Sequence, residues 1–310
     1  MYKRILVPLD GSELGEIALP YSEVLAEKLD SEIILLNVRS SGEDPDNPEH
    51  RAYLSKKAAE VEQNIKKSSE LVPQQKIKVA SAIIGSSGLL THAAEEIVDY
   101  AEKEKVSLIV MATHGRTGIR RWALGSTADK VVRAAKCPTL LVRANIELPQ
   151  NIKLDKILVT LDGSKESETV LPHVENVASK LKAKVVLLHV VVPPYHIYPI
   201  TQGVGYYADS GIIKVPYSEA EIKPLINGAQ EYLQKISSKL TEQGVESSYM
   251  VRIGFPGEKI IEAEEESGVD LVVMSTHGES GFTRWEHGSI ADKVLHAGNT
   301  PLLLVRELPS

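Results

Sequence analysis

The chain of 310 residues repeats itself in order, and this repeat constrains the fold more than any other feature. The matching segments are ILVPLDGS (5–12) with ILVTLDGS (157–164), IILLNV (33–38) with VVLLHV (185–190), MATHG (111–115) with MSTHG (274–278), and LLVR (140–143) with LLVR (303–306). Because the matches keep their order along the whole chain, the sequence predicts two copies of one fold in tandem.

A polar segment marks the boundary between the copies. Residues 144–151 contain a proline and show neither helical nor strand periodicity. The total length also suits two domains of about 150 residues each. We therefore expect one domain over residues 1–147 and a second over residues 152–310, and the short link between them favours direct packing of the two.

Composition narrows the class of protein. A formal net charge of −7, with 25% charged and 43% hydrophobic residues, is ordinary for a mildly acidic globular protein and argues against nucleic acid or an anionic membrane as the partner. The single cysteine, Cys137, leaves no intrachain disulfide and fits a reducing compartment. No apolar run approaches the roughly 18–20 residues that span a bilayer, and the N-terminus is unlike a signal peptide. We therefore expect a cytoplasmic location.

Short apolar runs alternate with amphipathic segments in the first copy. The runs that we interpret as strands are 5–9, 33–38, 77–84, 107–112 and 139–142. The segments with apolar residues at helical spacing are 13–29, 51–71, 89–101 and 126–135. Pro20 should bend or break the first helix, and the third strand should lie at or near a sheet edge. The alternation predicts an α/β fold in which each copy forms a doubly wound, five-stranded parallel sheet.

The second copy has 17 additional residues after its second strand, because the offset between matching residues grows from 152 to 169. The region 191–218 is rich in proline and tyrosine. We expect a surface loop packed by its tyrosines. A lid over the pocket of the second copy and a surface for a partner are the alternatives.

Ligands of doubly wound sheets bind beyond the carboxyl ends of the strands, where the strand order reverses. The residues expected at this edge are Asp10, Val38 and Met111 in the first copy, and Asp162, Val190 and Met274 in the second. The usual nucleotide motifs are absent, since the sequence has no P-loop and its first strand is not followed by G-x-G-x-x-G.

A different glycine pattern follows the fourth strand in both copies: a glycine, nine residues, and then Gly-Ser at the start of a helix. The residues are Gly115 with Gly125 and Ser126, and Gly278 with Gly288 and Ser289. Glycine lets the backbone approach phosphate oxygens, and a helix start offers N–H groups and partial positive charge. The serine hydroxyl can cap the helix or donate to a phosphate. The pattern therefore indicates an anion site.

With these residues the chain resembles the universal stress protein family over nearly all of both halves. The family signature is G-x-x-G, nine residues and G-[ST], with an aspartate that ends the first strand. Here Ala112 and Ser275 stand in place of the first glycine, a change that narrows the pocket without closing it. The resemblance implies the adenine nucleotide alpha-hydrolase-like fold and the binding of ATP, with any Mg²⁺ carried by the phosphates.

The resemblance also implies a role for each matching residue. The base and ribose side would be formed by Pro8, Leu9 and Asp10 and by Thr160, Leu161 and Asp162, with Val38 and Val190 against adenine. Met111 and Ala112, like Met274 and Ser275, would lie along the ribose, with Gly115, Gly125, Ser126 and Thr127, or Gly278, Gly288, Ser289 and Ile290, around the phosphates.

The two sites differ in charge. The nine residues between Gly115 and Gly125 include three arginines and no acidic residue, whereas those between Gly278 and Gly288 carry a net charge of −1. This difference of four charges around the phosphates should affect the affinity for a triphosphate. We therefore expect the first copy to be the stronger ATP site and the second to be weak or empty.

Some of these residues also have purely structural interpretations. Asp10 and Asp162 can cap the turn that follows each of them, which does not exclude ligand contact. His114 and His277 have no nucleophile or acidic partner at a recognisable spacing, so we interpret them as hydrogen-bonding loop residues and not as catalytic or metal-binding groups.

The two tryptophans and the cysteine are interpreted in the same way. Trp122 and Trp285 occupy matching positions before the phosphate-loop helix, where they should pack the loop onto the sheet, with base stacking as the alternative. Cys137 should be an inert, small apolar residue.

The favoured function is a stress-response sensor or regulator whose bound ATP changes or stabilises its shape for an unknown protein partner. A slow ATPase is one alternative, although no general base or acidic metal cage is evident. An interaction scaffold with vestigial pockets is another, suggested by the missing first glycines. The resemblance also implies that the fifth strands, 140–143 and 303–306, pair across a pseudo-two-fold axis as an intrachain pseudo-dimer. Assembly into a homo-oligomer stays open.

Overall fold

The fold is known from a computed structural model that describes residues 1–39, 47–68, 77–85, 93–114, 124–143, 152–199, 212–276 and 289–306. The first half contains β1 (Arg4–Pro8), α1 (Glu13–Glu16), α2 (Ala18–Leu29), β2 (Glu32–Arg39), α3 (Pro48–Ser68), β3 (Val79–Gly85), α4 (Ala93–Lys103), β4 (Leu108–Ala112), α5 (Ser126–Ala134) and β5 (Thr139–Val142). The second half contains β6 (Lys156–Thr160), α6 (Lys165–Glu168), α7 (Leu171–Leu181), β7 (Lys184–Val191), β8 (Tyr195–Pro199), β9 (Ile212–Pro216), α8 (Glu219–Glu242), β10 (Ser247–Ile253), α9 (Pro256–Ser267), β11 (Leu271–Ser275), α10 (Ser289–Ala297) and β12 (Leu302–Val305).

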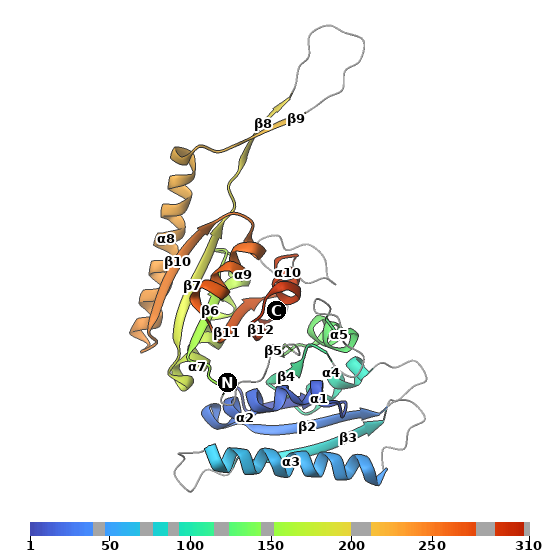
Figure 1. The fold of residues 1–310 in the computed structure, drawn as a ribbon. Helices are drawn as coiled ribbons and strands as arrows, with labels where there is room; N and C mark the ends of the chain where they lie inside the picture. Colours follow the sequence, from blue (N-terminus) through green and yellow to red (C-terminus); the bar gives the residue numbers. More distant parts are fainter. Residues whose placement is uncertain are drawn as a thin grey trace, which may run out of the picture.

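Ten of the described strands form one continuous sheet in the order β10-β7-β6-β11-β12-β5-β4-β1-β2-β3 (Figure 1). Neighbouring strands are parallel within each half, and β3 lies at the edge as predicted. In each half the first strand lies between the second and the fourth, so the strand order reverses there. The predicted α/β fold with a doubly wound parallel sheet in each half is confirmed.

The two halves join through their fifth strands. β5 and β12 pair antiparallel, with Leu141 opposite Leu302 and Leu140 opposite Leu303. This confirms the predicted pairing of these strands. It also leaves neither strand as an exposed apolar edge, which would otherwise be a template for aggregation.

The alternation of side chains along the strands divides the core into two layers, one on each face of the sheet. Ile5, Val7 and Ile33 belong to the layer covered by α2, α3, α7 and α8. Leu6 and Ile34 belong to the opposite layer, under α4, α5, α9 and α10. Because both faces are covered, the strands are apolar on both sides, which explains why they appear in the sequence as continuous hydrophobic runs.

Prolines explain why the first helix of each half is divided. Pro20 has no N–H to donate to the carbonyl of Glu16, and α1 ends at that residue. Pro172 has the same relation to Glu168, where α6 ends. The break expected around Pro20 therefore occurs, with α1 ending four residues before the proline, and Pro172 repeats this arrangement in the second half.

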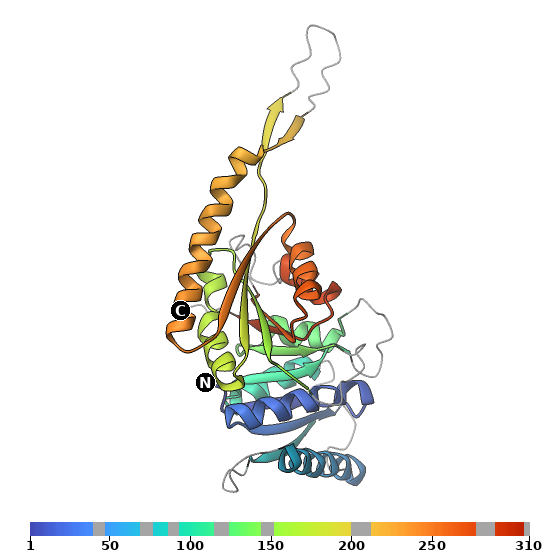
Figure 2. The ribbon, with the colours of Figure 1, turned by 60° about the vertical axis from the view of Figure 1, so that its left-hand side comes forward.

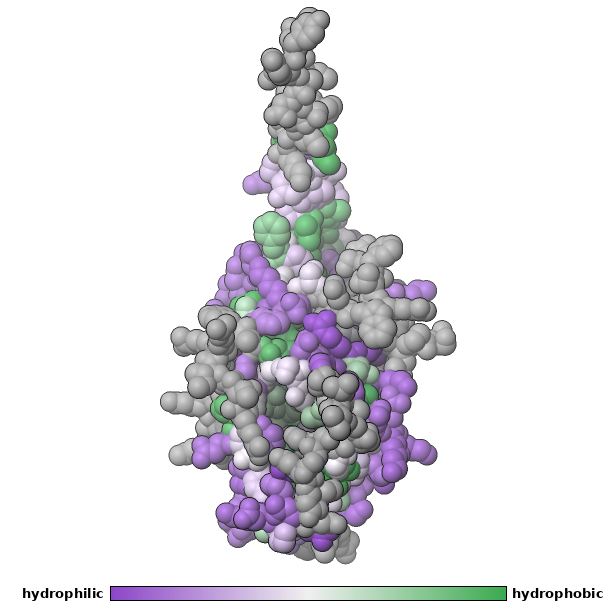
Figure 3. All heavy atoms as spheres, turned by 90° about the vertical axis from the view of Figure 1, so that its right-hand side faces the viewer, coloured by the Kyte–Doolittle hydropathy of each residue, from purple (hydrophilic) through white to green (hydrophobic). Residues whose placement is uncertain are grey.

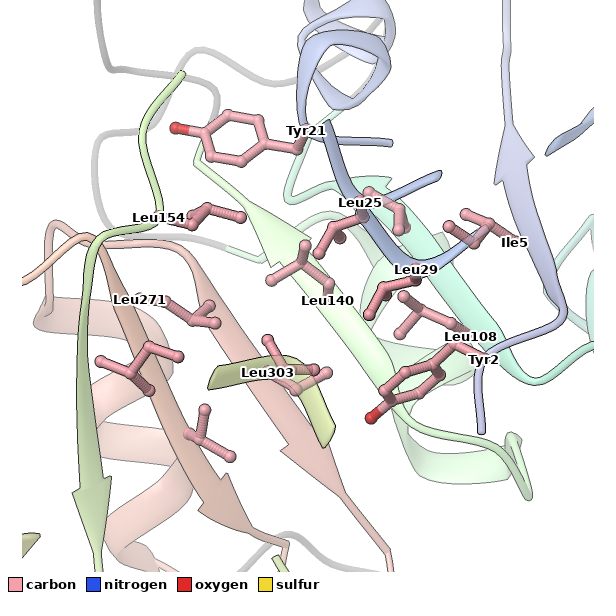
Figure 4. Close-up of a cluster of buried hydrophobic side chains, with 14 of the residues drawn as sticks. Tyr2, Ile5, Tyr21, Leu25, Leu29, Leu108, Leu140, Leu154, Leu271 and Leu303 are labelled. Carbon is pink, nitrogen blue, oxygen red and sulfur yellow. The ribbon is translucent and has the colours of Figure 1, made fainter. Parts of the chain in front are cut away.

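A cluster of buried side chains links the halves on one face of the sheet (Figure 4). Leu140 and Leu303 come from the paired strands, and α2 packs against α7 beside them. Tyr2, which is 1% exposed, makes a 2.7 Å hydrogen bond between its hydroxyl and Nδ1 of His173. The two halves therefore share a core as well as a sheet.

The inserted segment forms a projecting ribbon. β8 and β9 pair antiparallel, with His196 opposite Val215, and extend away from the sheet and its helices (Figures 1 and 2). The prediction of a loop packed by its tyrosines is therefore wrong for residues 195–199 and 212–216, because the β-branched and aromatic residues of these two segments favour strand pairing. Figure 3 shows hydrophobic surface at the base of this ribbon.

None of the helices in the described ranges combines the length and the apolar character needed to cross a bilayer.

Candidate functional site

A cavity of about 770 Å³ lies in the second half, beyond the carboxyl ends of β6, β7 and β11. Its volume is in the range of pockets that bind small molecules. The residues predicted from the sequence that line this cavity are Thr160, Leu161, Asp162, Val190, Met274, Ser275, Ser289 and Ile290. Gly278 and Gly288 lie outside the described residues. Eight of the ten residues predicted for the second copy therefore meet at one cavity.

The turn after the first strand is built identically in both halves. In the second half, the Oδ1 atom of Asp162 accepts hydrogen bonds from the backbone N–H of Ser164 at 3.0 Å and from its hydroxyl at 2.6 Å. Asp10 holds Ser12 with the same two distances in the first half. The capping role considered for both aspartates is therefore present, and Asp162 still lines the cavity. The glycine between each pair, at φ +82° and +88°, supplies the left-handed backbone of the turn.

Sequence reasoning missed one wall of the cavity, which comes from α8. Leu225, Gly228, Ala229 and Tyr232 line the cavity from this helix. Their spacing places them on one helical face, which was a usable signal. Their distance from the strand ends was not predictable from the sequence, because it depends on how α8 packs against β7 and β10. The other lining residues that sequence reasoning missed are Gly163, Ser167, Leu188, His189, Val191, Val192, Pro256, Ile260, Thr276 and Ala291.

In the first half, the predicted residues lie at the matching edge of the sheet. The carboxyl ends of the strands contain Pro8 in β1, Val38 in β2, and Met111 and Ala112 in β4. Leu9 and Asp10 follow directly after β1. The Asn37 side chain donates to the carbonyl of Leu9 at 2.6 Å, which ties β2 to the turn. Gly115 lies outside the described residues.

Gly125 brings the start of α5 against the end of β4. Its N–H donates to the carbonyl of Thr113 at 2.8 Å, and a Cβ on Gly125 would lie 3.0 Å from that oxygen. A side chain at this position would therefore push the helix start outward. Gly125 is the N-cap and Ser126 is the first residue of α5, with no side-chain cap. The capping role considered for Ser126 is therefore absent; Ser126 is exposed and Thr127 is half-buried in the first turn of α5.

The two halves differ at matching positions near the edge. Arg39, which is 6% exposed, ends β2 in the first half. The matching residue of the second half is Val191, which lines the cavity. The first half therefore has a buried guanidinium where the second half has an apolar side chain.

The described histidine of the loop after β4 is held by its neighbour. Nδ1 of His114 lies 3.1 Å from the hydroxyl of Thr113, and burial lowers the pKa of His114. This geometry agrees with a hydrogen-bonding loop residue. His277, Trp122 and Trp285 lie outside the described residues.

Burial raises the pKa of the Cys137 thiol to about 11. The thiol therefore stays protonated at neutral pH, which agrees with an inert residue. Within the described ranges, no group of three or more His, Cys, Asp or Glu side chains is arranged to hold a metal ion.

Comparison with known proteins places the chain in a family. The sequence profile of the Universal stress protein family matches residues 1–143 and again residues 153–306. The chain belongs to the universal stress protein family. A universal stress protein of Methanocaldococcus jannaschii is 32% identical over 146 residues, which cover 46% of this chain and 83% of that protein.

Solved universal stress proteins share the fold. The crystal structure of a universal stress protein from Archaeoglobus fulgidus covers 98% of both chains with a TM-score of 0.66 and 20% identity, so this likeness extends to both halves. Another universal stress protein, solved in complex with cAMP, is 18% identical and covers 46% of this chain and 98% of its own, with a TM-score of 0.34.

Proposed function

We propose that this universal stress protein binds ATP, with the first half as the stronger site, and that bound ATP sets its shape for a protein partner in a stress response. In the first half, the observation that carries the proposal is the close approach of the start of α5 to the end of β4 at Gly125; in the second half, eight predicted nucleotide-site residues meet at the matching cavity. The first half repeats the same strands, turn and helix start. The two nucleotide domains would span residues 1–147 and 152–310.

The residues of the first half fit an adenine nucleotide. Val38 and Met111 supply apolar surface for a base, and Asp10 supplies a carboxylate for ribose hydroxyls. The start of α5 at Ser126 offers first-turn N–H groups to phosphate oxygens. Any Mg²⁺ would be held by the phosphates themselves. The protein's part is to bind and orient the nucleotide.

Charge supports the first half as the stronger triphosphate site. The buried Arg39 is matched by Val191, and the three arginines between Gly115 and Gly125 are matched by a segment with a net charge of −1. A triphosphate attracts cations and is repelled by carboxylates. Both differences favour the first half.

Mass spectrometry of the ligand released from the purified protein, followed by an ATPase assay, tests the function. Co-purified ATP with negligible phosphate release supports the sensor. ADP with steady turnover would establish a slow ATPase instead, and the absence of any ligand or measurable ATP affinity would establish a scaffold with vestigial pockets.

Titration of ATP into the full chain tests the inequality of the halves. We expect one strong site per chain, and an Arg39→Met variant should weaken it about tenfold or more with little change in the thermal midpoint. Two equal ATP sites per chain would contradict the proposal.

A further inference from the structure

We propose that the cavity of the second half binds an uncharged heteroaromatic ligand of the nucleoside class in preference to a nucleoside triphosphate, with Tyr232 of α8 as a hydrogen-bonding specificity residue. This inference rests on the proposed function, because it assigns different ligands to the two matching sites. It goes beyond that function, which leaves the second site weak or empty for ATP.

The charges of the residues that line the cavity disfavour a nucleoside triphosphate. Among the described residues that line it, Asp162 is the single charged side chain, and no lysine or arginine is present. A ligand with three or four negative charges would meet net negative charge here, which costs free energy at short range even in salt. An uncharged ligand avoids this cost.

The size and the apolar walls of the cavity favour a flat, uncharged ring system. Leu188, Val190 and Ile260 present apolar surface, and the α8 wall adds Leu225 and Ala229. A volume of about 770 Å³ is sufficient for a ligand of nucleoside size. Burial of a flat, uncharged ring system against such walls is favourable, at about 25 cal/mol per Å² of apolar surface removed from water. The walls therefore suit a heteroaromatic ring better than a chain of phosphates.

The hydroxyl of Tyr232 is placed to form a hydrogen bond with a ligand in the cavity. Its Oη atom is buried at the cavity wall and makes no hydrogen bond of good geometry within the described residues, although the side chains of Glu168 and Ser167 lie near it. Burial raises the pKa of this hydroxyl, as do the nearby carboxylates of Glu168 and Asp162, so it stays protonated and can donate. A buried polar atom without a partner is costly, and a ligand acceptor such as a ring nitrogen or a sugar oxygen would remove that cost.

The ring of Tyr232 is also held in place for this role. It meets His189 edge to face, with the ring centroids 6.1 Å apart and the planes at 73°. The position that matches His189 in the first half is Asn37, whose amide is used to hold Leu9. The aromatic pair is therefore a feature of the second half, and it adds a rigid polar edge to an apolar cavity.

Calorimetric titration of the full chain with adenosine and with ATP tests the proposal through a matched pair of variants. Val190→Trp fills the cavity of the second half, and Val38→Trp makes the same change at the matching position of the first half. We expect Val38→Trp to lose ATP binding and to keep an adenosine site whose affinity is insensitive to salt. Val190→Trp should keep ATP binding and lose that adenosine site.

Three results would overturn the proposal: no adenosine binding to Val38→Trp, tighter binding of ATP than of adenosine to Val38→Trp, or an adenosine site in Val190→Trp equal to that in Val38→Trp. Failure of the proposed function looks different. In that case the wild-type protein would not bind ATP, while adenosine binding sensitive to Val190→Trp would remain.

A conservative change isolates the hydroxyl. Tyr232→Phe in the Val38→Trp background keeps the ring and removes one oxygen. We expect adenosine affinity to fall about tenfold, with a thermal midpoint that changes little, because the lost hydroxyl makes no hydrogen bond of good geometry in the free protein. Unchanged adenosine affinity would overturn the role of Tyr232, and a lowered midpoint with unchanged affinity would show a structural role instead.

Discussion

Arg143, at the end of the first half, donates from Nη2 to the carbonyl oxygen of Val294, in α10 of the second half, at 2.8 Å. The same guanidinium also donates to the carbonyls of Leu295 and Thr300. Carbonyls in the last turn of a helix have no intrahelical partner, so Arg143 acts as a C-terminal cap supplied by the other half. Arg306, its match in the repeat, donates in return to the carbonyl of Arg133 in α5.

This exchange predicts unequal losses when either arginine is removed. Arg143 is 6% exposed and lies beside Glu264, which is 3% exposed, whereas the residue that matches Glu264 in the first half is Ala101. Arg143→Met removes the positive charge near a buried carboxylate and takes a donor from three carbonyls, and we expect a loss of about 3 kcal/mol in the free energy of unfolding. Arg306→Met is the matched control and should cost about 1 kcal/mol. Urea unfolding measures both, and equal losses would contradict the account.

The contact between Tyr2 and His173 predicts a dependence of stability on pH. Burial lowers the pKa of His173 and keeps its ring neutral in the folded protein. The unfolded chain therefore binds the proton at higher pH, so the stabilisation is complete above about pH 6.5 and is lost as the pH falls toward the folded value.

Thermal unfolding between pH 7.5 and pH 5 checks this dependence. His173→Gln should flatten the profile and leave the contribution of His114, whose pKa is also lowered by burial. A wild-type protein that becomes more stable as the pH falls through this range would contradict the prediction.

The root of the projecting ribbon is held by Glu221. Its carboxylate accepts from the side chain and backbone of Ser218 and lies 2.8 Å from Nε2 of His196, whose ring stacks on Tyr217. These hydrogen bonds lower the pKa of Glu221 to about 2.

Glu221→Ala should therefore loosen the ribbon at neutral pH. We expect faster hydrogen exchange of the Tyr217 amide, which donates to the carbonyl of Pro194 at 3.1 Å and closes the ribbon's base. Glu219→Ala, in the same helical turn, is the control and should leave this amide protected. Equal exchange in the two variants would show that Glu221 does not anchor the ribbon.

Gly228 lies inside α8 and lines the cavity. A Cβ at this position would meet nothing within 4 Å. Because glycine inside a helix costs about 1 kcal/mol relative to alanine, Gly228→Ala should raise the free energy of unfolding by up to that amount. If a ligand approaches α8 closely, the same change should weaken its binding. Urea unfolding and adenosine titration in the Val38→Trp background measure the two effects, and a destabilised variant would contradict the first.

The strands were predictable because a parallel sheet covered on both faces needs runs that are apolar on both sides. The run 139–142 was predicted with the bounds of β5, and the helix predicted at Ser126 begins there. The ends of the divided helices were predicted less accurately. Pro20 cannot donate a hydrogen bond to the carbonyl of Glu16, so the helix ends one turn before the proline.

The tandem repeat, the order of strands and helices, and the residues at the carboxyl edge of each sheet could be predicted before the structure was known. These follow from local patterns of hydrophobicity and glycine. Three features emerged from the folded structure alone: α8 supplies a cavity wall, Arg143 caps a helix of the other half, and β8 pairs with β9. These contacts join residues distant in the chain, and their free energies depend on packing that no local pattern records.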